Sequence, residues 1–150
     1  MDYYRASDII VNFIRSKIEE SGSNGAVVGL SGGIDSAVTA YLMVEALGSN
    51  NVLGIHLPES YITPTQDTVD SELIANELGI TYKNIEISRL LNCFLSEIPD
   101  KADDYPSVVG NLKSRIRMSI LYYYANFFNK LVIGTGNKSE IMLGYFTKYG

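Results

Sequence analysis

One stretch of the sequence decides the fold: Ala26-Val27-Val28-Gly29-Leu30-Ser31-Gly32-Gly33-Ile34-Asp35-Ser36. Its first part, residues 26–30, is a short continuous apolar run, which is typical of a strand buried on both faces of a sheet. A polar turn with two glycines follows at 31–35, and the pattern then predicts a helix to about residue 47, before Gly48. A buried strand that passes through a tight turn into a helix is typical of the α/β class.

The remaining sequence continues this alternation. Further strands are predicted at 52–57, 80–87 and 131–134, and helices at 3–20, about 64–78, 88–97 and 110–129. Strands that alternate with helices predict a doubly wound parallel sheet with helices on both faces. The chain winds outward from its first strand, and a long crossover then returns to the other side of that strand. The expected strand order is therefore 3-2-1-4.

Three local patterns carry more detailed predictions. Apolar residues recur on one side of two helices: Ile10, Phe13, Ile14 and Ile18 in the first, and Leu112, Ile116, Ser119/Ile120, Tyr123 and Phe127 in the long one. At the start of helix 64–78, Thr63 is expected to cap, Pro64 to occupy the first turn and Gln66 to complete a capping box. An acidic loop is predicted at 99–106, and the last residues, 144–150, look irregular.

The composition is that of a folded domain in a reducing compartment. The chain has 150 residues, 46% of them hydrophobic and 19% charged, so it is too apolar to be disordered and long enough to bury a core. Its formal net charge of −5 argues against a broad nucleic-acid-binding surface. The lone Cys93 cannot form an internal disulfide and is expected in the core. No signal peptide or membrane span is predicted, so we expect a cytoplasmic protein without nucleic-acid or membrane partners.

Two loops are expected to line one crevice at the carboxyl ends of the strands. Residues 31–36 follow the first strand and residues 135–140 follow the fourth, where the winding of the sheet reverses and ligands bind in such folds. The glycines, the hydroxyls and the helix N-terminus of the first loop predict an anion site that suits a pyrophosphate. A carboxylate repels phosphate, so Asp35 predicts a bridging Mg²⁺, with Glu140 as the second carboxylate.

The first loop also carries a family signature. It matches neither the GxxxxGKS/T nor the GxGxxG nucleotide pattern. Its SGGxDS pattern resembles the ATP pyrophosphatases, which split ATP between the α and β phosphates. The segments GNLKSRIRM at 110–118, Gly134-Thr135, Glu140 and GYFTKYG at 144–150 extend this resemblance to the ammonia-dependent NAD synthetases. The GYFTKYG segment discriminates best, because other ATP pyrophosphatases share only the first loop.

The resemblance implies an adenine nucleotide alpha hydrolase-like fold and a carbon–nitrogen ligase that acts in the last step of NAD biosynthesis. Deamido-NAD is adenylated by ATP with loss of pyrophosphate, and ammonia then displaces AMP to give NAD⁺. The enzyme is expected to be a homodimer that uses Mg²⁺, and no acid–base residue is identified. The implied ATP contacts are Gly29, Leu30, Ser31, Gly32, Gly33, Ile34, Asp35, Ser36 and Thr135; the implied deamido-NAD contacts are Arg115 and Lys148; the implied metal ligands are Asp35 and Glu140.

Several residues keep a second interpretation. Arg115 and Arg117 also suit a solvated basic helix face, and Lys148 also suits the surface. Tyr145 and Phe146 suit either stacking on a flat ring or apolar packing. His56 is expected to be structural. The alternative functions are another SGGxDS ATP pyrophosphatase, similar to GMP synthetases or tRNA-modifying enzymes, and a non-catalytic nucleotide-binding module.

The extent of the chain carries two expectations. Residues 1–150 are expected to form a single domain that is incomplete at its C-terminus, because the family pattern continues beyond the KYG at 148–150; alone, this part is expected not to complete the reaction. Only thirty residues precede Ser31, which leaves no room for a glutaminase domain there. Free ammonia, or ammonia delivered by another protein, is therefore the expected nitrogen donor.

Overall fold

Four parallel strands form the centre of the computed structural model, which describes residues 2–100 and 105–150. They are β1 (Ala26–Gly29), β2 (Val52–His56), β3 (Thr81–Asn84) and β4 (Leu131–Ile133), in the order β3-β2-β1-β4. Val28 of β1 is paired with Gly54 of β2 on one side and with Ile133 of β4 on the other. The predicted parallel sheet and its strand order are confirmed.

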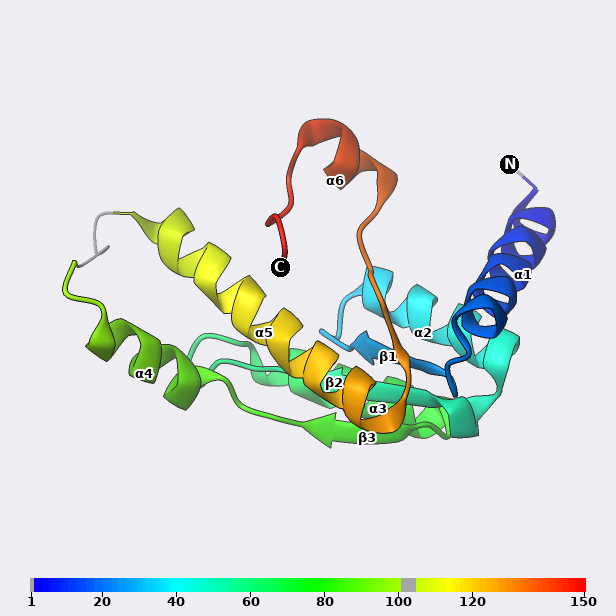
Figure 1. Ribbon diagram of the computed structural model, residues 1–150, viewed down its shortest axis with the longest axis horizontal. Coiled ribbons are helices and arrows are strands. Elements are labelled where there is room, and N and C mark those ends of the chain that lie inside the picture. Colours follow the sequence, from blue (N-terminus) through cyan, green and yellow to red (C-terminus); the bar gives the residue numbers. More distant parts are fainter. Residues whose placement is uncertain (1, 101–104) are drawn as a thin grey trace.

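Helices cover both faces of the sheet (Figure 1). The first face carries α1 (Tyr3–Ser21), α2 (Ile34–Leu47) and α3 (Thr65–Leu78), and the second carries α4 (Ser88–Glu97) and α5 (Pro106–Phe128). Adjacent β1 residues point to opposite layers: Val28 packs with Met43 of α2, whereas Val27 packs with Leu121 of α5. This alternation explains why the β1 sequence is apolar at every position.

The predicted apolar stripes of α1 and α5 face the core only in part. In α1 the buried residues are Val11, Ile14 and Ile18, while Phe13 is 60% exposed. In α5 the buried residues are Ile116, Leu121 and Ala125; Tyr123 and Phe127, from the predicted stripe, are exposed. Both helices are apolar on more than one side, so periodicity alone could not select the packed side.

Several local predictions need correction. Thr63 does not cap α3: its hydroxyl accepts a hydrogen bond from the Glu59 amide at 2.9 Å, and Pro64 stands at the N-cap position without a side-chain bond. Strand β3 covers only Thr81–Asn84, and β4 is half-buried rather than buried. Cys93 is exposed on α4, not in the core. Of the predicted acidic loop, residues 101–104 lie outside the described residues.

The amino ends of three strands are tied together by one lysine. Lys130 precedes β4, and its Nζ donates to the carbonyl of Asn51, before β2, at 2.7 Å and to that of Asn24, before β1, at 3.3 Å. Burial lowers the pKa of Lys130 from its ordinary value. Gly25 completes this junction, because a Cβ there would overlap the Asn51 carbonyl. These contacts lie at the amino ends of the strands, so they leave the loops at the carboxyl ends unobstructed.

The C-terminal part rises from the sheet and turns back toward α5 (Figure 1). After β4, a short helix, α6 (Lys138–Leu143), is followed by an irregular segment, as predicted. The Thr147 hydroxyl donates to Oδ1 of Asn111 on α5 at 2.7 Å. None of the described helices has the length and apolar character needed to cross a membrane.

Candidate active site

The turn after β1 is held in shape by its own two serines. The Ser36 hydroxyl is buried and donates to the Gly33 carbonyl at 2.9 Å, while it accepts from the Ser31 amide at 3.2 Å. The Ser31 hydroxyl accepts from the Gly33 amide at 3.1 Å. Because the proton of Ser36 is already used, this residue shapes the loop, whereas the sequence had suggested that both hydroxyls serve as donors to a ligand.

Helix α2 begins directly in this turn. Its N-cap residue, Gly33, has an extended backbone and supplies no side-chain cap, so the amides of the first turn are not covered by a capping side chain. Uncapped amides at a helix N-terminus, together with the positive end of the helix dipole, form a site for an anion. The turn at 31–36, which we call the phosphate loop, therefore has the geometry of an anion site, and its binding of phosphate stays a prediction.

Gly32 is required where the loop passes α3. Its φ is +90°, and a Cβ at this position would lie 2.5 Å from the main-chain oxygen of Asp67. Only glycine combines this backbone conformation with so close an approach. Gly33 is less restricted: an added Cβ would be 3.3 Å from the Ser31 hydroxyl. The first turn of α3 thus forms one wall of the phosphate loop.

His56, at the end of β2, links this strand to the end of β1 and to α3. It is buried, with Nδ1 2.7 Å from the Leu30 carbonyl oxygen and Nε2 3.0 Å from the Thr68 hydroxyl of α3. A carbonyl only accepts, so Nδ1 carries the proton, and Nε2 accepts from Thr68. His56 therefore has the structural role that was expected, because it fixes Leu30, the residue immediately before the phosphate loop.

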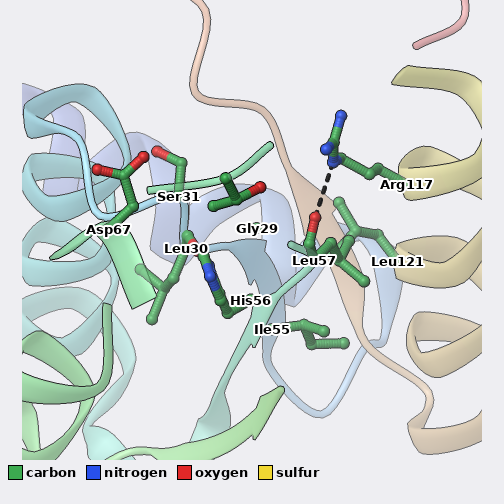
Figure 2. A pocket seen from close by; sticks show the side chains of 10 residues that line it. Gly29, Leu30, Ser31, Ile55, His56, Leu57, Asp67, Arg117 and Leu121 are labelled. Atoms are coloured by element: carbon green, nitrogen blue, oxygen red, sulfur yellow. Dashed lines mark hydrogen bonds between the residues drawn. The ribbon is translucent and has the colours of Figure 1, made fainter. Parts of the chain in front are cut away.

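A cavity of about 340 Å³ opens beside this loop, over the carboxyl ends of β1 and β2 (Figure 2). Its floor and walls are mostly apolar, and its polar groups come from opposite sides. It is lined by Gly29, Leu30, Ser31, Ile55, His56, Leu57, Thr63, Asp67, Arg117 and Leu121. Such a cavity, with few polar groups at its edges, suits a flat heterocycle and a sugar.

A second cavity, of about 280 Å³, lies over β1 and β4 and contains Thr135 and Gly136. Gly29, Arg117 and Leu121 line both cavities, so the two meet above the end of β1. A Cβ on Gly29 would touch the Leu121 side chain at 3.4 Å. The two loops predicted to share a crevice therefore do so, with α5 as the opposite wall.

Arg117 is the main residue that sequence reasoning missed. Its Nε donates to the Leu57 carbonyl at 2.9 Å, across sixty residues of sequence, and its guanidinium points toward the open side of the crevice (Figure 2). Burial lowers its pKa from the ordinary value, and the nearby Glu59 carboxylate acts in the opposite direction. The sequence offered no signal that separated it from Arg115 on the same helix.

Of the two predicted metal ligands, Asp35 lines a third cavity and Glu140 does not. The Asp35 carboxylate lies in the first turn of α2 and lines this cavity of about 470 Å³ together with Thr135 and Asn137. Glu140 belongs to a capping box at the start of α6: its Oε2 accepts from the Asn137 amide at 2.9 Å. The Asp35 carboxylate and Oε1 of Glu140 make no hydrogen bond to described residues, so they are available as ligands.

These donors fit Mg²⁺ better than a transition metal. Within residues 2–100 and 105–150, no group of three or more His, Cys, Asp or Glu side chains could hold a metal ion. Mg²⁺ commonly takes one or two carboxylates and completes its shell with water and phosphate oxygens. Two carboxylates beside an anion site meet that requirement.

The two predicted dinucleotide contacts, Arg115 and Lys148, are neighbours in the structure. Nε of Arg115 donates to the Lys148 carbonyl at 3.3 Å, and both side chains are exposed. The Lys148 ammonium lies 5.0 Å from the ring centre of Tyr149. A cavity of about 470 Å³ separates Tyr145 and Phe146 from the small residues of α5, including Gly110 and Ser114. Both aromatic rings are exposed, which leaves their two interpretations open.

The chain resembles characterised proteins along its whole length. The family model for NAD synthase matches residues 6–150. The NH3-dependent NAD+ synthetase of Methanococcoides burtonii is 57% identical over 150 residues, which are 100% of this chain and 57% of that protein. The structure of the NH3-dependent NAD synthetase from Campylobacter jejuni superposes with a TM-score of 0.92 at 41% identity, over 100% of this chain and 63% of that one.

A second solved structure extends the comparison to another product. The NMN synthetase from Francisella tularensis superposes with a TM-score of 0.89 at 34% identity, over 100% of this chain and 61% of that one. The chain thus spans between 57% and 63% of the length of these three proteins. Because the family model covers nearly all of its residues, the chain belongs to the NAD synthase family.

Proposed function

We propose that the protein carrying this chain is an ammonia-dependent NAD synthetase, which converts deamido-NAD, ATP and ammonia into NAD⁺, AMP and pyrophosphate. One observation carries the proposal: an anion-binding loop of the form SGGxDS joins β1 to α2 in a chain of the NAD synthase family. The same loop supports an ATP pyrophosphatase in general; the name of the 57% identical relative favours NAD⁺ as the product.

In this proposal, ATP binds along the crevice above β1. The purine and ribose fit the apolar cavity of about 340 Å³ beside Leu30 and Leu57. The phosphates then extend over Ser31–Ser36, where the amides of α2 point outward. Thr135 adds a hydroxyl from the facing loop. The proposed contacts with ATP are those predicted from the sequence, Gly29 to Ser36 and Thr135, with Ser36 acting through the shape of the loop.

Asp35 and Glu140 would hold a Mg²⁺ ion between the two loops. When bound, the ion would neutralise phosphate charge and help pyrophosphate to leave. The chain's own part is to provide two carboxylates from rigid helix starts, α2 and α6, on either side of the anion site. Arg115 and Lys148 supply positive charge for the phosphates and carboxylate of deamido-NAD, and both come from the α5 side of the crevice.

The reaction needs positioning more than acid–base chemistry. A nicotinate carboxylate oxygen forms a bond to the α-phosphorus, and pyrophosphate leaves with the electron pair of the broken bond. The resulting acyl adenylate has a good leaving group, so ammonia forms a bond to its carbonyl carbon. The carbon–oxygen bond to AMP then breaks, AMP leaves with the electron pair, and the added nitrogen releases one proton to the solution. The loop amides stabilise charge on the phosphates, and the apolar walls around Leu57 and Leu121 limit access of water. No residue is assigned as a general acid or base.

The assembly is proposed to be a homodimer that acts in the cytoplasm, with residues 1–150 belonging to one domain. An apolar groove of about 540 Å³ runs between α4 and α5 and includes Phe94, Leu112 and Tyr123. Tyr122, Phe127 and Phe128 extend this exposed apolar surface along α5. A surface of this kind, rimmed by polar residues, is typical of a subunit interface. Sedimentation of the full-length protein would show a dimer if this is correct and a monomer if it is not.

The similarity to an NMN synthetase makes the substrate itself testable. The full-length gene product is assayed with ATP, Mg²⁺ and ammonium, and with deamido-NAD or nicotinate mononucleotide as acceptor. We expect NAD⁺ and pyrophosphate in equal amounts with deamido-NAD. If only nicotinate mononucleotide is amidated, that compound and not deamido-NAD is the substrate. ATP binding without any amidation would favour a non-catalytic module or another ATP pyrophosphatase and would refute the proposal.

A further inference from the structure

Arg117 occupies the junction of the crevice. It is one of three residues, with Gly29 and Leu121, that line both the cavity over β1 and β2 and the cavity over β1 and β4. The other two offer only a main chain and an apolar side chain. Arg117 is therefore the charged group at the point where the two cavities meet.

The guanidinium is held so that most of its donors remain free. Nε is bonded to the Leu57 carbonyl at 2.9 Å, which fixes the side chain against the end of β2. The two terminal nitrogens make no hydrogen bond to residues 2–100 or 105–150. The end of the guanidinium extends away from Leu57 (Figure 2), and Arg117 lines both cavities. An arginine anchored through Nε can present its remaining N–H groups to an oxyanion in a fixed orientation.

The positive charge of Arg117 has no carboxylate of its own. The nearest acidic group, Glu59, forms an ion pair with Lys113 one helical turn earlier, at 2.7 Å, and both of these side chains are largely buried. Among the residues that the structure describes, Arg117 forms no ion pair. The local balance of Lys113, Glu59 and Arg117 is therefore one positive charge, and it is directed at the cavity junction.

We infer that Arg117 is a further substrate-contacting residue of this site and that its guanidinium binds the α-phosphate of the adenine nucleotide. This inference rests on the proposed function. The nucleoside occupies the cavity beside Leu57, and the pyrophosphate lies on the loop before α2, on the wall opposite α5. The α-phosphate joins these two parts, so it falls at the junction that Arg117 lines. Negative charge also develops on this group during attack, where a fixed guanidinium is most useful.

A purine contact is the competing role, and comparison of two ligands separates them. AMP and adenosine differ only in the α-phosphate. Binding of each to the full-length protein is measured by calorimetry for wild type, Arg117→Gln and Arg117→Lys, with Arg89→Gln, an exposed arginine of α4, as the matched control. We expect Arg117→Gln to weaken the binding of AMP by on the order of 10- to 100-fold and to leave the affinity for adenosine unchanged. Arg117→Lys should recover part of the AMP affinity, and Arg89→Gln should bind as wild type does.

Two results would overturn the inference. If AMP and adenosine weaken equally, Arg117 serves the purine or the fold; if neither weakens, it does not contact the nucleotide. Wild-type NAD⁺ formation in the same preparation separates these failures from failure of the proposed function. An active wild type with unchanged AMP binding in Arg117→Gln refutes only the role of Arg117, whereas a wild type that neither amidates nor binds AMP refutes both. If Arg117→Gln does not fold, Arg117→Lys carries the same comparison.

Discussion

The imidazole of His56 holds the carbonyl of Leu30: Nδ1 and the oxygen are 2.7 Å apart, in the interior, one residue before the phosphate loop. Through Nε2 the same ring holds Thr68 of α3, whose first turn also contacts Gly32. The position of the phosphate loop is thus fixed from β2 and α3, not only from the strand that carries it.

Replacement of His56 should loosen this loop. His56→Leu leaves the Leu30 carbonyl and the Thr68 hydroxyl without partners, so we expect a loss of about 1–3 kcal/mol in unfolding free energy. The affinity for ATP should fall as well. His56→Asn can still donate to Leu30 and should retain more of both. Urea unfolding and ATP calorimetry test this, and equal effects of Leu and Asn would contradict the role given to the Leu30 bond.

The two glycines of the loop should differ in their tolerance of a methyl group. Gly32→Ala combines a φ of +90° with a Cβ 2.5 Å from the Asp67 main chain, so the loop and α3 must separate. Gly33→Ala adds a Cβ 3.3 Å from a hydroxyl at a negative φ. We expect Gly32→Ala to abolish measurable ATP binding and Gly33→Ala to weaken it less. The reverse order of effects would exclude the packing of α3 on the loop as the cause.

The carboxylates of Asp35 and Glu140 should set the requirement for Mg²⁺. Asp35→Asn and Glu140→Gln each remove one negative charge, while Gln can still accept the bond from the Asn137 amide that starts α6. When activity is titrated with Mg²⁺, both variants should need a higher concentration for half-saturation than wild type does. Asp8→Asn, which changes an exposed carboxylate of α1, should need the same concentration as wild type. A Mg²⁺ dependence identical to wild type in Asp35→Asn would remove that residue from the metal site.

Glu86 should make the stability depend on pH in the acid range. Hydrogen bonds from the Ser88 side chain and from the Ser60 and Ser88 amides lower the pKa of Glu86 to about 2 from an ordinary value of 4.5. The folded state therefore stabilises the ionised form of Glu86 relative to the unfolded state. This contribution is complete above about pH 4.5 and is lost as the pH falls toward about 2.

Unfolding of wild type and Glu86→Gln at several pH values measures this contribution directly. The variant should be less stable at neutral pH, and the difference should shrink between pH 4.5 and 2. A difference that stays constant over this range would show that the charge of Glu86 does not matter. The test concerns the contact between Glu86, in the loop from β3 to α4, and Ser60, in the loop from β2 to α3, and it needs no nucleotide.

The parallel strands and their order could be predicted from the sequence, because β1, β2 and β4 are mostly apolar runs that alternate with strong helix signals. The bounds of β3 were predicted less well, because its four residues, Thr81–Asn84, are mostly polar and none of them is buried. Val27 and Val28 are apolar on both sides of β1, which only a doubly covered sheet explains. The packed sides of α1 and α5 could be predicted only in part, because the exposed Phe13 and Phe127 have the same apolar character as the residues that are buried. Side-chain periodicity is informative only when the outer face is polar.

The candidate site divides in the same way. Local sequence was sufficient for the phosphate loop, since the turn and the helix start are consecutive along the chain. Contacts that depend on the folded chain were not predictable. Arg117 donates to the Leu57 carbonyl across sixty positions, and Thr63, only four residues from Glu59, accepts from the Glu59 amide instead of capping its helix. These two contacts depend on how α5 and the β2–α3 loop pack in three dimensions, and residue type alone does not predict this packing.

The central claim is that the carboxylate of deamido-NAD attacks the α-phosphate of ATP in the crevice above β1. Deamido-NAD with heavy oxygen in its nicotinate carboxylate tests it most directly, by mass spectrometry of the products formed by the full-length enzyme. The claim predicts one labelled oxygen in AMP and none in pyrophosphate, because ammonia expels AMP together with a carboxylate oxygen. Unlabelled AMP, or label in any other phosphate product, would contradict it.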